Sequence, residues 1–345
     1  MPRAELPSFC GMIGRTSAMR ALFRQVKRIA PVDVPVLIQG ESGTGKELVA
    51  TAIHRLSPRS GLRFEVVNCG ALTRELLLSE LFGHERGAFT GAVERRAGIL
   101  GAADGGTVFL DEVGELSPEA QVALLRFLAN GEIRPVGSTS TRRVDVRLIA
   151  ATHRDLDVAA REGSFREDFY YRLRRVVLEV PPLRARREDV PLLVEHYRLR
   201  FDERYGLAVD GLTDAAMRKL ESYTWPGNVR ELEAVLEQAM IFKGRGWLAP
   251  RDLDLRPVAR RAADASHARP PLSGGPGLTQ YQEEALGIAE RRGEVRRLDL
   301  MGRFRISHEF ARRQLLALVR MGLLRPVGSG RGARYVSVGR SEESR

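Results

Sequence analysis

The stretch Val36-Leu37-Ile38-Gln39-Gly40-Glu41-Ser42-Gly43-Thr44-Gly45-Lys46-Glu47 decides the fold of this 345-residue chain. Its first residues are apolar and mostly β-branched, which is typical of a buried parallel strand. A glycine-rich turn follows, and residues 47–54 read as a helix. The glycines let backbone N–H groups converge on a phosphate at the positive end of that helix. Strand, turn and helix in this order predict a phosphate-binding loop.

The residues that follow the glycines of that loop also bear on nucleotide binding. Lys46 would place a point charge on the β- and γ-phosphates of a nucleotide. The general pattern has Ser or Thr after the lysine, to hold magnesium, and this chain has Glu47 there. The residues expected to bind ATP are Gly40, Glu41, Ser42, Gly43, Thr44, Gly45, Lys46 and Glu47.

A second strand, Thr107-Val108-Phe109-Leu110, ends in Asp111-Glu112. Carboxylates at the carboxyl end of a parallel strand lie where ligands bind in open α/β sheets. We therefore expect Asp111 to hold Mg²⁺ and Glu112 to act as the general base on water. A third strand, residues 147–151, ends in Thr152-His153, which could report the loss of the γ-phosphate or could be ordinary polar residues at a strand end.

The pattern of strands and helices divides the chain into four parts. Residues 12–180 alternate short apolar runs with helical patterns, which predicts a doubly wound α/β domain with a parallel sheet. Residues 181–250 contain no strand run and are predicted to form a small helical lid. Residues 251–277 are rich in Ala, Arg, Pro and Gly and read as a linker. Residues 278–338 form a further small domain.

Composition indicates a cytoplasmic protein with a basic C-terminal part. No apolar stretch is long enough to cross a membrane, and Cys10 and Cys69 fit neither a metal spacing nor a disulfide framework. The net charge is +11, and residues 278–338 contribute +6 of it, from twelve arginines against six acidic residues. A compact basic segment fits double-stranded DNA as a partner, although solvated arginines alone would give the same charge.

The last domain is expected to be a small α+β winged helix-turn-helix. Helices are predicted at 278–292, at the end of 295–304 and at 308–321, where Ser307 would cap the third. Residues 323–327 and 333–338 flank a glycine-rich turn and predict a hairpin. The third helix would enter the major groove and the hairpin would meet phosphates, unless the domain contacts protein instead. The arginines expected on DNA are Arg312, Arg313, Arg325, Arg331 and Arg334.

The hexapeptide Gly87-Ala88-Phe89-Thr90-Gly91-Ala92 interrupts a helical pattern between the phosphate loop and the acidic strand. With it, the chain resembles the AAA+ ATPase domain of bacterial sigma-54-dependent activators over residues 13–250. In that family the same six residues form a surface loop that contacts the sigma factor. Without the resemblance, a tight turn with Phe89 in the core would be the simpler interpretation.

The resemblance implies roles for further residues. The segment 165–173 looks like the family's arginine fingers, so that Arg166 and Arg172 would reach the γ-phosphate of a neighbouring subunit, unless they only pair with Glu167 or Asp168. Residues 225–232 look like the second sensor, with Asn228 as the helix N-cap and Arg230 facing the nucleotide. Residues 134–143 look like the second pore loop. Asn68 would hydrogen-bond Glu112 and couple nucleotide state to the sigma-contacting loop.

We expect from these features an ATP- and Mg²⁺-dependent ring, a hexamer, that remodels the closed promoter complex of sigma-54 RNA polymerase from an upstream DNA site. The ATPase pattern begins within about twelve residues of the N-terminus, so control by an inhibitory protein in trans or by controlled expression is expected, and not by an attached receiver domain. Two alternatives remain open: an AAA+ DNA-remodelling or branch-migration motor with a winged helix, and a DNA-binding regulator that does not hydrolyse nucleotide.

Overall fold

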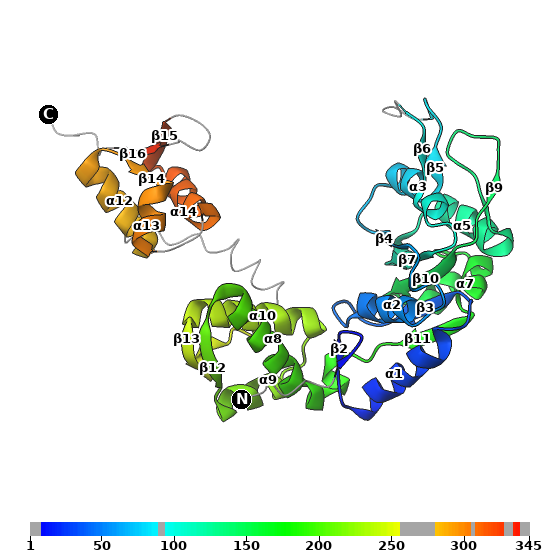
Figure 1. Ribbon diagram of the computed structural model, residues 1–345, viewed down its shortest axis with the longest axis horizontal. Helices are drawn as coiled ribbons and strands as arrows, with labels where there is room; N and C mark the ends of the chain where they lie inside the picture. The colour runs from blue at the N-terminus through cyan, green and yellow to red at the C-terminus, as the bar shows by residue number, and fades with distance from the viewer. Residues whose placement is uncertain (1–7, 89–93, 256–279, 305–307, 328–333, 339–345) are drawn as a thin grey trace. The chain divides into compact units, whose positions relative to one another are not determined.

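The computed structural model describes residues 8–88, 94–255, 280–304, 308–327 and 334–338. The chain separates into two compact units, residues 1–265 and 266–345, and each is described by itself (Figure 1). Among the described residues, no helix is both long and apolar enough to span a bilayer.

A five-stranded parallel sheet forms the centre of the N-terminal unit, in the order β11–β3–β10–β7–β4 (Figure 1). Its strands are β3 (Val36–Gln39), β4 (Phe64–Asn68), β7 (Thr107–Asp111), β10 (Arg147–Thr152) and β11 (Val176–Glu179). Register places Thr152 beside Gln39, and Asn68 beside Asp111. The carboxyl ends of the strands therefore meet at one edge, where the phosphate loop, the acidic pair and Thr152-His153 all emerge.

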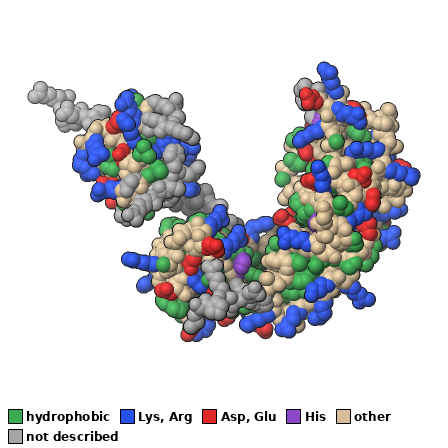
Figure 2. Space-filling view, viewed as in Figure 1, with side chains coloured by type: hydrophobic (Ala, Val, Ile, Leu, Met, Phe, Trp, Pro, Cys, Tyr) green, Lys and Arg blue, Asp and Glu red, His purple; other side chains and the backbone are tan. Residues whose placement is uncertain are grey.

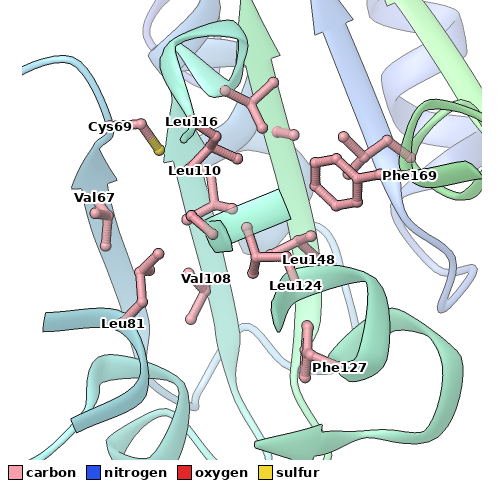
Figure 3. Close-up of a cluster of buried hydrophobic side chains, with 14 of the residues drawn as sticks. Val67, Cys69, Leu81, Val108, Leu110, Leu116, Leu124, Phe127, Leu148 and Phe169 are labelled. Atoms are coloured by element: carbon pink, nitrogen blue, oxygen red, sulfur yellow. The ribbon is translucent and has the colours of Figure 1, made fainter. Parts of the chain in front are cut away.

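Alternate residues of these strands build two different cores. Leu110, Leu148 and their neighbours on one face pack against helices α3 (Arg74–Phe82), α5 (Pro118–Asn130) and α7 (Glu167–Leu173) (Figure 3). Ile38, Phe109, Ile149 and their neighbours pack on the opposite face against α1 (Ser17–Ile29) and α2 (Lys46–Arg55). Because both faces are covered, the inner strands β3, β7 and β10 are buried and apolar along most of their length, as expected for a parallel sheet.

Shorter strands, helices and turns complete the sheet domain. They are β1 (Ser8–Phe9), β2 (Met12–Ile13), β5 (Gly83–His84), β6 (Arg96–Ala97), α4 (Ile99–Ala102), β8 (Glu132–Ile133), β9 (Arg142–Arg143) and α6 (Leu156–Arg161), with a 3₁₀ turn at Val113–Glu115. Two further 3₁₀ turns, Leu183–Ala185 and Arg187–Asp189, lead out of the sheet domain.

The following segment contains the predicted helices and two strands that were not predicted. Helices α8 (Val190–Tyr205), α9 (Asp214–Ser222) and α10 (Asn228–Lys243) surround a core centred on Trp225, which is fully buried. Strands β12 (Ala208–Leu212) and β13 (Arg245–Leu248) pair in parallel beside them, and a 3₁₀ turn follows at Pro250–Asp252. The expectation of a lid without strands is wrong. Each strand is too short to form a long apolar run, and its partner lies more than thirty residues away in the sequence, so no local pattern indicates the pairing.

The described part of the C-terminal unit forms three helices and a three-stranded antiparallel sheet. The elements follow in the order α12 (Gln280–Arg292), β14 (Val295–Arg296), α13 (Arg297–Phe304), α14 (His308–Arg320), β15 (Leu324–Val327) and β16 (Arg334–Ser337). Strand β14 joins the predicted hairpin by pairing with β16. The hydrophobic core of the C-terminal unit includes Ala285, Leu300, Leu315 and Tyr335. Ser307, the predicted cap, and Arg331 lie outside the described residues.

Candidate nucleotide-binding site

The loop between β3 and α2 has the chemistry of an anion cradle. Gly43 and Gly45 take left-handed φ angles of +77° and +100°, which residues with a Cβ resist. Within the described structure, the N–H groups of Gly43, Gly45 and Lys46 donate to no protein acceptor. Lys46 Nζ donates instead to the oxygens of Gly40 (3.0 Å) and Glu41 (3.4 Å). The loop thus offers unpaired donors beside a buried cation, which is what a bound phosphate requires.

Glu112, directly after β7, is held by two cationic or donor groups. Lys46 Nζ lies 3.6 Å from its Oε1, and His153 Nδ1 lies 2.6 Å from its Oε2. Burial acts to raise the pKa of Glu112, but the hydrogen bond from His153 and the charge of Lys46 outweigh it and lower the pKa overall. The residue also has a left-handed φ of +54°. Glu112 is therefore an ionised carboxylate in a constrained position, as a general base requires.

The predicted hydrogen bond between Asn68 and Glu112 is absent. Asn68 Oδ1 accepts from the Gly70 N–H at 2.9 Å and closes its own turn. The strand register places Asn68 beside Asp111. The next residue, Glu112, has a left-handed backbone, and its carboxylate contacts His153 at the end of β10. The interaction that sequence reasoning assigned to Asn68 belongs to His153.

Thr152 and His153 separate in the structure. Thr152 is fully buried; its Oγ1 accepts from Arg154 N at 3.0 Å, and its carbonyl accepts from Gly40 N at 3.2 Å. It therefore ties the end of β10 to the start of the phosphate loop, and only His153 reaches a catalytic candidate.

The lid approaches the loop through the start of α10. The backbone N–H groups of Val229 and Arg230 donate to Gly43 O at 3.0 and 3.3 Å, and Arg230 Nη1 donates to Ser42 Oγ at 3.2 Å. Asn228 was predicted to cap this helix, but Gly227 precedes it as the N-cap and donates its N–H to Glu231 Oε2 at 2.8 Å. The prediction is wrong because the Asn228 side chain is used elsewhere: it donates to Glu41 Oε2 and Ser42 O.

A cavity of about 310 Å³ lies where these parts meet. Eight predicted residues line it: Ser42, Gly43, Gly45, Lys46, Glu47, Asp111, Glu112 and Arg230. Leu48, Tyr197, Val229 and Glu233 also line it and were not predicted as site residues. Val229 lies within the second-sensor segment, whereas no local motif marks Tyr197 on α8 or Glu233 on α10. Gly40 and Glu41 face a neighbouring hollow with His153 instead, and Thr44 lines an apolar pocket with Met12, Ile13 and Val49.

The donor set of the cavity fits Mg²⁺ when phosphate oxygens complete it. Asp111 and Glu47 both line the cavity, and burial, then the charge of Glu112, raise the pKa of Asp111. Among the described residues, no three His, Cys, Asp or Glu side chains form a metal site by themselves. Magnesium is commonly held by one or two carboxylates together with phosphates and water, so the residues present suffice.

Comparison with known proteins identifies the family. Residues 12–179 match the model of the sigma-54 interaction domain, and residues 184–270 match that of the AAA+ ATPase lid domain. The transcriptional regulatory protein ZraR of Klebsiella oxytoca is 50% identical over 294 residues, which are 85% of this chain and 66% of that protein. The crystal structure of NtrX from Brucella abortus in complex with ADP superposes with a TM-score of 0.66 at 32% identity, covering 89% of this chain and 68% of that one.

This chain is a member of the sigma-54-dependent transcriptional activator family. The Nif-specific regulatory protein of Azotobacter vinelandii is also similar, at 45% identity over 82% of this chain and 54% of that protein. The chain thus spans between half and two thirds of the length of these curated relatives. The expected AAA+ P-loop fold, with its parallel sheet and lid, is confirmed, and the family match decides against the branch-migration alternative.

In this sigma-54-dependent activator, the described part of the Gly87–Ala92 hexapeptide is its first two residues. Phe89, Thr90, Gly91 and Ala92 lie outside the described residues. The residues before them pair with the segment 134–143, which was predicted to be the second pore loop: Glu85 N donates to Val136 O at 3.0 Å, and Val136 N donates to Gly83 O at 2.8 Å. The segment that leads into the hexapeptide is thus joined by backbone hydrogen bonds to residues 134–143.

The two candidate arginine fingers lie in different environments. Arg166 is exposed and forms a bidentate pair with Asp168, at 2.7 and 3.0 Å. Arg172, on α7, has no hydrogen bond or ion pair with any residue that the structure describes. Neither lines the 310 Å³ cavity of its own chain.

Gly43→Ala should separate the loop from the lid. A Cβ at residue 43 would lie 2.3 Å from Gly227 O, at a φ of +77°. We expect binding of the fluorescent nucleotide MANT-ADP, measured by titration, to weaken at least about ten-fold because loop and lid cannot both keep their places. Gly61→Ala is the control, since its Cβ meets no atom within 4 Å. Equal affinities for the two variants would contradict the close approach.

Proposed function

We propose that this chain hydrolyses ATP and uses the energy to remodel the closed promoter complex of sigma-54 RNA polymerase. The observation that carries the proposal is the joining of Lys46, Asp111 and Glu112 in one cavity, on a chain whose family is defined by sigma-54 interaction. The loop N–H groups and Lys46 would bind the phosphates. The Glu112 carboxylate would accept a proton from the attacking water. Magnesium, held by Asp111 with Glu47 beside it, would neutralise charge on the phosphates.

The apolar pocket next to the loop is suited to the base of the nucleotide. Met12, Ile13, Leu48 and Val49 line it, and Thr44 and Gly45 connect it to the phosphate loop. An adenine ring buries well among such side chains, and its phosphates would then reach the cavity at Lys46. The ADP complex of the NtrX relative supports the same choice of ligand.

A ring would bring a second subunit to this cavity. We propose a hexamer in which Arg172, and Arg166 once released from Asp168, stabilise charge at the neighbour's γ-phosphate. An arginine supplied in trans commonly contributes about 10³–10⁵ in rate, whereas an exposed intrachain pair contributes little to stability. We also place the protein in the cytoplasm.

Glu112→Gln should abolish hydrolysis and retain binding. We expect the ATPase rate, measured as phosphate release, to fall at least about 100-fold, because the amide cannot accept the proton. MANT-ADP affinity should change less than about two-fold. Glu115→Gln is the control, because that carboxylate pairs with Arg154 outside the cavity. A second experiment tests the coupling to sigma-54. If wild type captures purified sigma-54 only in the presence of ADP–aluminium fluoride, the coupling is supported. If wild type fails to capture sigma-54 under every nucleotide condition, the transcriptional role is refuted.

Mixing two inactive variants tests catalysis across subunits. Lys46→Ala subunits keep both arginines, and Arg172→Ala subunits keep the phosphate loop. We expect each variant alone to have under about 1% of wild-type ATPase activity. Their mixture should regain part of the activity, because some boundaries then contain both intact halves. Mixed oligomers that remain inactive at every ratio would place Arg172 outside the neighbour's site.

The C-terminal unit is proposed to bind an upstream DNA site as a winged helix. Within its described part, no ion pair engages Arg312, Arg313 or Arg325, which are exposed on α14 and β15. Arg334, also predicted to bind DNA, pairs with Glu294 at 3.1 Å. Arginine side chains are spread over the visible surface of the unit (Figure 2). Arg312 and Arg313, which pair with no residue that the structure describes, therefore support the DNA proposal.

Removing Arg312 and Arg313 together should weaken DNA binding at low salt. We expect the slope of log affinity against log salt to become shallower by about 2, because each phosphate contact releases condensed counterions. Arg291→Ala with Arg292→Ala is the matched control: it removes the same charge from residues that pair with Glu284 and Asp299. Equal slopes for both double variants, measured by fluorescence anisotropy, would contradict an α14 interface.

A further inference from the structure

The phosphate loop can present N–H groups to a ligand only if its carbonyl oxygens point elsewhere and find partners. A backbone carbonyl that is buried without a hydrogen bond is costly. In this chain the partners of three consecutive carbonyls come from beyond the sheet domain. Ser42 O accepts from Asn228 Nδ2 at 3.0 Å, Gly43 O from Val229 and Arg230, and Thr44 O from Arg186 Nη2 at 3.1 Å. The lid therefore completes the hydrogen bonding of the loop.

The Glu41 side chain adds an ionic contact to the same junction. Arg184, in the 3₁₀ turn that leads to the lid, donates from both terminal nitrogens to the Glu41 carboxylate, at 2.7 and 2.5 Å. Asn228 Nδ2 donates to the same carboxylate at 3.1 Å. These hydrogen bonds, that of Arg184 first, lower the pKa of Glu41 to about 2, so the pair stays ionic at neutral pH. A bidentate contact of this kind fixes the orientation of the Glu41 carboxylate as well as its distance from Arg184.

Asn228, at the start of α10, also contacts the segment that leads to the lid. It is fully buried, with a left-handed φ of +52°, and its Oδ1 accepts from Leu183 N at 2.8 Å. One amide thus bridges the phosphate loop, the segment that carries Arg184, and the start of α10. An asparagine tolerates this backbone better than most residues and offers two donors and an acceptor together.

We propose that Arg184 and Asn228 are positioning residues that hold the phosphate loop open for nucleotide, through Glu41 and the outward carbonyls of the loop. The proposal rests on the proposed nucleotide function of the same site. Neither side chain lines the 310 Å³ cavity, so they act through the loop and not on the nucleotide. Because the loop holds the phosphates both before and during hydrolysis, disturbing it should weaken binding more than it slows the chemical step.

The test measures MANT-ADP affinity, ATP KM and kcat, and melting temperature for the full chain and its variants. Arg184→Gln should weaken MANT-ADP binding and raise KM about five-fold in 50 mM salt, with kcat changed less than about two-fold. Arg184→Lys should show a smaller loss, since it keeps the charge but not the two-pronged geometry. Asn228→Asp should weaken binding about ten-fold or more, because a second carboxylate would then face Glu41.

Arg187→Gln is the matched control. Arg187 is exposed in the adjoining turn, and no described residue pairs with it, so the same loss of charge should leave affinity unchanged. If Arg184→Gln binds MANT-ADP as tightly as Arg187→Gln, the proposal is wrong. A lowered melting temperature with unchanged affinity at an assay temperature where both variants are folded would likewise reduce Arg184 to a structural role.

A double variant tests the route through Glu41. If Arg184 acts through that carboxylate, Arg184→Gln combined with Glu41→Gln should bind MANT-ADP no more weakly than the weaker single variant, whereas independent effects would multiply. Multiplied effects would overturn the coupling. MANT-ADP binding does not require hydrolysis, so a wild type that binds it without hydrolysing ATP would defeat the proposed function alone. A wild type that does not bind it would defeat both.

Discussion

Everything at this site depends on the backbone of residues 40–46, which must direct donors inward while its carbonyls stay hydrogen-bonded. Part of the solution is local: left-handed glycines turn the chain, and Lys46 folds back onto the carbonyls of Gly40 and Glu41. The rest is distant, because Asn228, Arg186 and the first turn of α10 satisfy the following carbonyls. A phosphate loop in this chain is therefore a product of two subdomains.

The same constraint accounts for residues with no catalytic contact. Arg186 is buried, and Asp189, fully buried nearby, accepts from Arg15 N, Thr16 N and Thr16 Oγ1 at 2.6–3.0 Å. The N-terminal segment is thus fastened to the turn that carries Arg184 and Arg186. This anchoring places the apolar pocket of Met12 and Ile13 beside the loop. In this way, polar contacts outside the phosphate loop would determine where a nucleotide base can bind.

At the other side of the cavity, charge is balanced at one carboxylate. Glu112 has Lys46 on one oxygen and His153 on the other, so a single side chain links the start of α2 with the ends of β7 and β10. A bound phosphate would compete with Glu112 for Lys46, since the ammonium can approach only so many anions at once. Such competition would change the charge around Glu112 and His153 at the end of β10.

The sequence by itself determined the parts whose signals are local. The glycine loop, the strand ending in Asp111-Glu112 and the hexapeptide at residues 87–92 each carry their chemistry within a few residues, and together they identified the family and the AAA+ fold. Only the tertiary structure decided the partners: His153 instead of Asn68 on Glu112, Asn228 as a bridge instead of a helix cap, Arg184 on Glu41, and the pairing of β12 with β13. Glu41 and Arg184 lie 143 positions apart, and Ser42 and Asn228 lie 186 apart. No periodicity or spacing marks such contacts, because they arise only once packing brings lid and sheet together.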